Sequence, residues 1–97
     1  MNRQEILEAL NAEGQELKRK YGVKTLAVFG SMARGDDREG SDVDVLVSFE
    51  GGTTFDRYFD LKFHLEEMLG RPVDLVTDKA LRPQMRPQID REAINVS

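Results

Sequence analysis

Three aspartates and a glycine–serine pair are the residues of this sequence best suited to chemistry. Ten residues separate Gly30-Ser31 from Asp42 and Asp44 in the pattern G-S-x10-D-x-D, and a third acid, Asp74, lies inside a later apolar run. Alternate side chains of a strand point to the same face, so Asp42 and Asp44 would project together, with Cα atoms about 6.5 to 7 Å apart. This spacing lets two carboxylates converge on shared cations.

Asp74 can join this pair if its strand lies beside theirs. Three adjoining carboxylates repel one another and are tolerated best when cations lie between them. Hard oxygen ligands favour Mg²⁺, with Mn²⁺ as an alternative, over zinc. In a site with two such ions about 3.5 to 4 Å apart, one ion activates the attacking oxygen and the other holds the leaving phosphates. Asp42, Asp44 and Asp74 are therefore the predicted catalytic residues and metal ligands.

Gly30 and Ser31 are the predicted phosphate contacts. A glycine at the end of a strand lets the backbone approach a ligand closely, and the helical turn that follows offers free N–H groups to an anion. The Ser31 hydroxyl adds a donor, and Arg34 could form charge-assisted hydrogen bonds to phosphate oxygens. A solvated surface charge is an equally good interpretation of Arg34. Together these groups are expected to hold the β and γ phosphates of a nucleoside triphosphate while the metals act at the α phosphate.

Hydrophobic periodicity predicts the elements that position these residues. Helical spacing runs from Asn2 to about Lys20, with a capping box formed by Asn2 and Glu5 and a stop at Gly22. A second helix is expected after Thr53 or Thr54, ending at Gly70. Short apolar runs predict strands at residues 25–29, 43–49 and 73–77.

Shorter elements are expected between and after these. Ser31 is predicted to cap a brief helical turn through Arg34, and a polar loop should follow over residues 36–41. Pro83 and Pro87 restrict the tail to short helical turns. The order of elements predicts a single domain over residues 1–97 of the α/β (α+β) class, in which helices pack on a small mixed sheet of three to four strands.

Composition excludes several classes of protein. A chain of 97 residues with a formal net charge of -4 can form one modest core but lacks the basic footprint of most nucleic-acid-binding proteins. It contains no cysteine, which excludes a disulfide framework and thiolate metal ligands. No signal peptide and no apolar stretch of membrane-spanning length is visible, so we expect a cytoplasmic protein without a membrane segment.

The segment GSMARGDDREGSDVDVLV resembles the signature of the DNA polymerase β-like nucleotidyltransferase superfamily, and the short chain is similar to its minimal nucleotidyltransferase (MNT) branch. The specific part covers residues 25–49, and Asp74 extends it. The resemblance implies the minimal nucleotidyltransferase fold, the three aspartates as metal ligands, and Gly30 and Ser31 as triphosphate contacts. It also implies a partner, because many members are antitoxins that inactivate a HEPN-domain toxin by transferring AMP from ATP to a tyrosine.

The leading hypothesis is therefore an enzyme, a protein adenylyltransferase. It would use two Mg²⁺ ions and ATP as co-substrate to transfer AMP to a hydroxyl, expected to be a tyrosine, of a HEPN toxin, with which it could form a hetero-oligomer. About twenty residues follow Thr77, too few for an acceptor domain, which favours a protein acceptor that brings its own binding surface. The amphipathic tail, residues 78–97, is the candidate contact region.

Two alternatives remain open at this stage. One is a non-catalytic antitoxin that masks its partner sterically, and the other is a nucleotidyltransferase subunit that modifies a small-molecule antibiotic. The base preference, the modified residue, the number of nucleotides transferred and the oligomeric state cannot be read from the sequence. The regularly spaced Phe55, Phe59 and Phe63 are interpreted as core residues rather than as a platform for stacking adenine.

Overall fold

The computed structural model describes residues 1–36, 38 and 40–96. Its elements follow the predicted order, and the predicted strand at 25–29 begins two residues earlier, at Val23. They are α1 (Arg3–Tyr21), β1 (Val23–Phe29), α2 (Gly30–Arg34), β2 (Val43–Phe49), α3 (Phe55–Leu69), β3 (Val73–Thr77), the 3-10 turns η1 (Asp78–Ala80) and η2 (Pro83–Met85), α4 (Arg86–Glu92) and β4 (Ile94–Asn95).

The long helices begin and end where the sequence predicts. Asn2 and Glu5 form a complete capping box at the start of α1, and Thr54 caps α3 by accepting a hydrogen bond from the backbone N–H of Arg57. Gly22 and Gly70 end the two helices in the left-handed conformation that glycine adopts most readily. The prediction for Ser31 is wrong: it lies inside α2, whose N-cap position is Phe29 and has no side-chain hydrogen bond.

The four strands form one mixed sheet in the order β3-β2-β1-β4. β1 and β2 are antiparallel, β2 and β3 are parallel, and β4 is antiparallel to β1. The parallel pairing follows from α3, which carries the chain back from the end of β2 to the start of β3. β2 is therefore a central strand, and β3 lies at an edge of the sheet.

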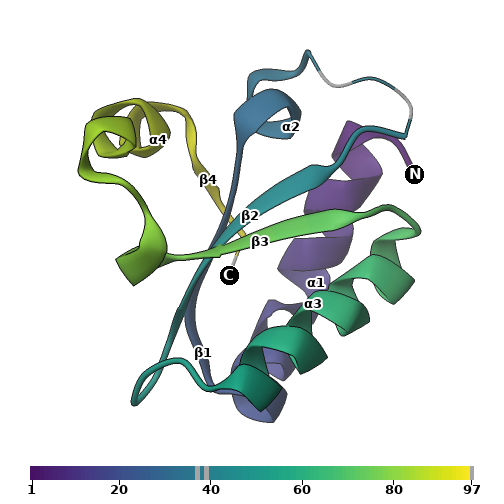
Figure 1. Cartoon of the computed structure of the whole chain (residues 1–97). Helices are drawn as coiled ribbons and strands as arrows, with labels where there is room; N and C mark the ends of the chain where they lie inside the picture. The colour runs from purple at the N-terminus through teal and green to yellow at the C-terminus, as the bar shows by residue number, and fades with distance from the viewer. Residues whose placement is uncertain (37, 39, 97) are drawn as a thin grey trace.

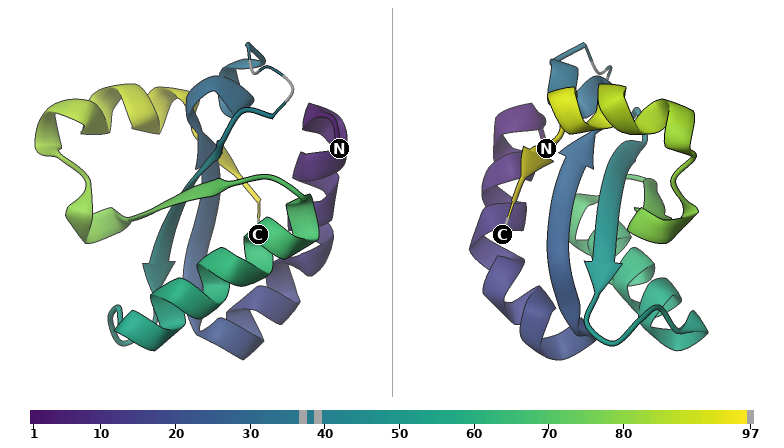
Figure 2. Two further views of the ribbon diagram at one scale, coloured as in Figure 1. Left: turned by 45° about the vertical axis from the view of Figure 1, so that its right-hand side comes forward. Right: turned by 90° about the vertical axis from the view of Figure 1, so that its left-hand side faces the viewer.

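The two faces of the sheet have different coverings. Figures 1 and 2 show α1 and α3 together on one face, with α4 on the opposite face near the end of β1. The face that carries α1 and α3 holds the hydrophobic core, to which β2 contributes every second residue. We call the opposite face, which carries Asp44 and Asp74, the open face.

β4 is the element that the sequence analysis missed. It is only two residues long, and Ile94 and Asn95 pair with Val28 and Ala27 of β1. A segment this short has no readable alternation, so its position depends on the strand it joins. Its pairing returns the tail to the sheet and places α4 next to α2.

Within the residues that the structure describes, none of the helices combines the length and the apolar character that crossing a membrane requires.

Candidate functional site

The aspartates of the G-S-x10-D-x-D pattern and Asp74 come from two neighbouring strands. Asp44 of β2 and Asp74 of β3 are partners in the register of the parallel pair, and Asp42 lies immediately before β2. Asp44 is half-buried, whereas Asp42 and Asp74 are exposed. Their neighbours Val43, Val45 and the residues flanking Asp74 are buried on the helix-covered face. The alternation of these strands therefore brings the acids to one end of the open face.

The charges of these aspartates act on one another. The pKa of Asp44 is raised, first by its partial burial and then by the neighbouring carboxylates of Asp74 and Asp42. The guanidinium group of Arg34 counteracts this in part, and the carboxylate of Glu92 adds to it. A bound cation would offset both the burial of the Asp44 charge and its repulsion by the neighbouring carboxylates.

The donor set fits a hard divalent cation, because carboxylate oxygens on adjacent strands are the ligands that Mg²⁺ prefers. Among the described residues, however, no three histidine, cysteine or acidic side chains already converge closely enough to hold a metal ion. The aspartates therefore lie as neighbours, and their side chains would have to turn inward to share an ion. Asp42 lies just outside β2, whereas Asp44 and Asp74 lie within paired strands.

The backbone at Gly30 lies directly against the side chain of Asp44. It follows β1 directly, with a φ of 69°, and a Cβ placed on it would overlap the Oδ2 atom of the Asp44 carboxylate. Both the left-handed backbone and the close approach therefore require glycine at this position. The structure thereby joins the two halves of the sequence pattern, because the backbone at Gly30 lies against the Asp44 side chain.

A cavity of about 310 Å³ lies beside this contact, between the end of β1, α2 and α4. Arg34 is among its lining residues, and its guanidinium group also pairs with Asp36 at 3.3 Å. Four of the six predicted site residues line it together with residues of the tail that the sequence analysis did not assign to the site. The lining residues are Phe29, Gly30, Ser31, Arg34, Asp44, Met85, Gln88, Ile89 and Glu92.

Among the lining residues that sequence reasoning did not assign to the site, Glu92 is the charged one. Its carboxylate accepts a hydrogen bond from the backbone N–H of Gly30 at 3.0 Å and pairs with the guanidinium of Arg34 at 3.2 Å. The side chain of Glu92 is only 14% exposed. No motif marks it, because its position depends on the pairing of β4 with β1, which the sequence does not reveal.

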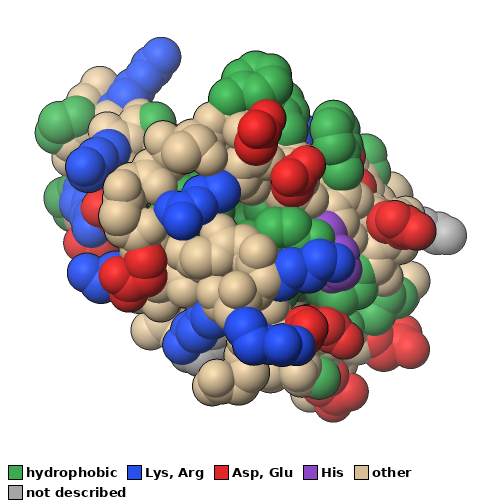
Figure 3. Space-filling view, turned by 90° about the horizontal axis from the view of Figure 1, so that it is seen from below, with side chains coloured by type: hydrophobic (Ala, Val, Ile, Leu, Met, Phe, Trp, Pro, Cys, Tyr) green, Lys and Arg blue, Asp and Glu red, His purple; other side chains and the backbone are tan. Residues whose placement is uncertain are grey.

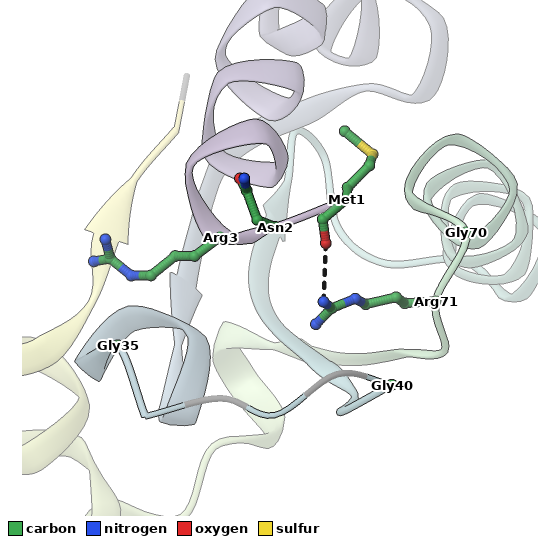
Figure 4. Close-up of a pocket in the computed structure, with 7 residues that line it drawn as sticks. All are labelled: Met1, Asn2, Arg3, Gly35, Gly40, Gly70 and Arg71. Atoms are coloured by element: carbon green, nitrogen blue, oxygen red, sulfur yellow. Dashed lines mark hydrogen bonds between the residues drawn. The ribbon is translucent and has the colours of Figure 1, made fainter.

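A second hollow, about 740 Å³ in volume, is lined by the start of α1, by Gly35 and Gly40 after α2, and by the turn at Gly70 and Arg71 (Figure 4). Arg3 extends from α1 toward α2, where its guanidinium donates hydrogen bonds to the backbone carbonyls of Met32 and Ala33 at 2.7 and 3.1 Å. Arg71 instead donates to the carbonyl of Met1 at 2.9 Å. Arg3 therefore holds α2 to α1, while Ser31 and Arg34 of α2 line the smaller cavity.

The three regularly spaced phenylalanines of α3 do not line the cavity and are not part of the buried core. Phe55 and Phe63 are 75% and 59% exposed, so their interpretation as core residues is wrong, and only Phe59 between them is half-buried. An α-helix turns once every 3.6 residues, so residues spaced by four lie progressively farther around it. The row of phenylalanines therefore does not stay on the buried face. Figure 3 shows hydrophobic side chains exposed among acidic ones on the face of the molecule that includes the first turns of α3.

The predicted contact region of the tail is largely folded onto the domain. Ile89 is buried, and Ile94 is partly buried against the core. Met85 is 44% exposed. The tail thus supplies a wall of the cavity, and its role as a contact region for a partner stays a prediction.

Comparisons with known proteins point to one family. The model of the nucleotidyltransferase domain family matches residues 14–95. The chain is 39% identical over 93 residues to protein adenylyltransferase MntA of Thermococcus cleftensis, covering 96% of this chain and 94% of the relative. It is also 41% identical over 95 residues to a protein of Methanocaldococcus jannaschii provisionally named a protein adenylyltransferase, covering 95% of each chain.

Solved structures share the fold. One described as a minimal nucleotidyltransferase, itself a provisional assignment, superposes with a TM-score of 0.83 at 42% identity and covers 97% of this chain and 95% of its own. The MNT antitoxin in a complex with a tri-AMPylated HEPN toxin of Shewanella oneidensis superposes with a TM-score of 0.67. That likeness, at 17% identity over 94% of this chain and 71% of the other, concerns the fold alone. The fold class expected from the sequence is confirmed, with four strands in the sheet.

Proposed function

This chain belongs to the nucleotidyltransferase domain family, and we propose that, as an enzyme of this class, it transfers AMP from ATP to a hydroxyl group of a partner protein. The observation that carries the proposal is the meeting of Asp44, Asp74 and Gly30 at one end of the open face. Acids that would hold cations and a glycine turn that would contact phosphates are thereby adjacent, as transfer of a nucleotide requires.

Asp42, Asp44 and Asp74 are the proposed ligands of two Mg²⁺ ions. Bound there, these ions would supply Lewis-acid stabilisation of the charge that develops on the phosphate oxygens. The pKa of Asp44 is raised first by partial burial and then by the carboxylates of Asp74 and Asp42, and a bound cation would offset both effects, which supports this assignment. The backbone of Gly30, the hydroxyl of Ser31 and the guanidinium of Arg34 are the proposed contacts of the β and γ phosphates.

These positions define the direction of the reaction. The acceptor oxygen attacks the α phosphorus, the bond from that phosphorus to the bridging oxygen of the β phosphate breaks, and pyrophosphate leaves. If the leaving group is held at Gly30 and Ser31, an in-line attack would bring the acceptor from the side of Asp74, which lies on β3, beyond the Asp44 of β2. Asp74 is exposed on an edge strand, where a protein hydroxyl can reach it, and its carboxylate is the proposed acceptor of the proton.

The proposed acceptor is a HEPN toxin, modified on a tyrosine hydroxyl, with this chain as its antitoxin. Support comes from relatives named protein adenylyltransferases and from the fold shared with MNT antitoxins in complexes with HEPN toxins. A toxin-antitoxin structure of the same fold was solved with AMP-PNP, which supports ATP as the nucleotide donor. A hetero-oligomer of the two proteins is part of this proposal.

Intact-mass spectrometry tests the function. A candidate HEPN partner protein would be purified after co-expression with the wild-type chain, with Asp44→Asn, or with Asp60→Asn, which changes an exposed acid of α3. We expect the wild type and Asp60→Asn to add one or more AMP groups and Asp44→Asn to add none. An unmodified partner that is nevertheless neutralised by all three chains would contradict transfer and favour steric masking.

A further inference from the structure

Glu92 binds the same groups that the proposed function assigns to the triphosphate. Its carboxylate accepts the hydrogen bond of the Gly30 N–H at 3.0 Å and lies 3.2 to 3.3 Å from the Nη1 atom of Arg34. A carboxylate is an anion, and both partners are donors suited to phosphate oxygens. A side chain of the protein therefore already satisfies two of the donors on which the nucleotide would depend.

The position of Glu92 follows from the fold. Two residues after it, Ile94 pairs with Val28 of β1, and Gly30 follows the last residue of that same strand. Ile89, one turn earlier in α4, is buried and anchors the helix. The backbone around Glu92 is thus fixed from both sides, so the carboxylate can leave the Gly30 N–H by rotation of its side chain while α4 stays in place.

The negative charge of Glu92 determines how its contacts with Gly30 and Arg34 affect the binding of a triphosphate. Three aspartates already crowd this end of the open face, and Glu92 adds a fourth carboxylate next to Asp44. A triphosphate, which carries several negative charges, cannot share the Gly30 N–H and Arg34 with Glu92 without repulsion. Arg34, which also pairs with Asp36, keeps an anionic partner when Glu92 lets go.

We propose that Glu92 sets the affinity of this enzyme for nucleoside triphosphate. In the nucleotide-free protein its carboxylate holds the Gly30 N–H and Arg34, and the triphosphate binds by displacing it. This inference rests on the proposed function, because it takes the triphosphate contacts from it. Glu92 acts here as an internal competitor of the substrate, so neutralising it strengthens binding, whereas a residue that only supported the fold would weaken binding when changed.

The test measures binding of inorganic tripolyphosphate with Mg²⁺ to the full chain by calorimetry. We expect Glu92→Gln, which keeps the shape but removes the charge, to bind about tenfold more tightly than the wild type. Asp90→Asn is the matched control, because Asp90 lies on the same helix, is exposed and pairs with Arg86 at 3.6 Å. We expect it to bind like the wild type. Equal or weaker binding by Glu92→Gln would overturn the proposal.

Loss of the Glu92 contacts also weakens the attachment of α4, so thermal unfolding is recorded for each variant. If Glu92→Gln does not fold, Glu92→Asp carries the test, because it keeps the charge but shortens the side chain that reaches Gly30. Tighter binding by this variant supports the proposal and equal or weaker binding overturns it. For folded variants, label transfer from ATP should show a lower KM in Glu92→Gln without a lower kcat.

The two proposals fail separately. Tripolyphosphate binding needs no acceptor and no transfer, so tighter binding by Glu92→Gln in a protein that modifies no partner would leave this inference intact and remove the adenylyltransferase. Transfer of AMP by the wild type, with tripolyphosphate binding unchanged in Glu92→Gln, would support the adenylyltransferase and overturn the role of Glu92.

Discussion

Along β2, Val43, Val45 and Val47 turn toward α1 and α3 and are fully buried, whereas the intervening Asp44 turns to the open face and is half-buried. The same contrast recurs on β3, where Val73 and Leu75 are buried on either side of the exposed Asp74. One face of the sheet therefore holds the domain together, and the other carries charges that burial would penalise. The two faces alternate residue by residue. A substitution at one position of a strand therefore affects the stability of the core, and a substitution at the next position affects the charge of the open face.

The largest expected effect comes from placing a charge on the helix-covered face. Val45→Asp would bury an unpaired carboxylate in the core and should lower the free energy of unfolding by more than about 4 kcal/mol, enough to unfold a small domain. Ser48→Asp, on the open face of the same strand, should cost less than about 1 kcal/mol. Urea unfolding measures both, and equal losses would mean that the two faces do not differ in this way.

The next largest effect is expected where the open face meets the glycine turn. Gly30→Ala would place a Cβ against the Asp44 carboxylate and should reduce AMP transfer by about a hundredfold or more. Gly70→Ala is the control, because Gly70 shares a positive φ but has no atom within 4 Å of a built Cβ. It should lose about 1 kcal/mol of stability and keep its activity. Equal losses of transfer rate would remove the special role of the Gly30 contact.

A smaller effect is expected from removing the contacts between Arg3 and α2. Arg3→Ala removes two hydrogen bonds to the carbonyls of Met32 and Ala33 and should cost about 1 to 3 kcal/mol of stability. The affinity for tripolyphosphate should fall as well, because α2 carries Ser31 and Arg34. Arg19→Ala, which changes a surface arginine paired with Glu16 in α1, should alter neither quantity appreciably. Unchanged phosphate affinity in Arg3→Ala would show that α2 keeps its place without this anchor.

The smallest effect tests the cost of charge on the open face. Since the pKa of Asp44 is raised in the folded protein, its ionised form destabilises the metal-free fold at neutral pH. Asp44→Asn should therefore raise the free energy of unfolding there by at most about 1 kcal/mol, because Asp44 is partly exposed and solvent screens it. The gain should vanish as the pH falls below the usual range of an aspartate. Thermal unfolding without metal that shows a loss at neutral pH would contradict this.

The sequence predicted well those features that depend on local patterns. The capping box at Asn2, the glycine stops of α1 and α3, and the alternation of β2 each reflect contacts between residues close in the chain. The pairing of Asp44 with Asp74 could be stated from the sequence only as a condition, that their strands be neighbours. The parallel register of β2 and β3 meets that condition.

Features that depend on distant contacts were missed or mistaken. The position of Glu92 follows from the pairing of β4 with β1, which joins residues far apart in the sequence. Phe55 and Phe63 have the spacing of core residues, but their exposure depends on how α3 is turned against the sheet. The metal-binding and phosphate-binding roles of the six site residues stay predictions, since the structure fixes their positions and only solution experiments test what they bind.

The central claim is that Asp74 acts with Asp42 and Asp44 as one catalytic group. The most direct measurement is transfer of label from α-labelled ATP to the partner protein in the presence of Mg²⁺, comparing the wild type with Asp74→Asn. Asp60→Asn, which changes an exposed acid on the helix-covered side, serves as control. We predict that Asp74→Asn folds normally and transfers label at least about a hundredfold more slowly, while Asp60→Asn matches the wild type. Transfer by Asp74→Asn at the wild-type rate would contradict the account.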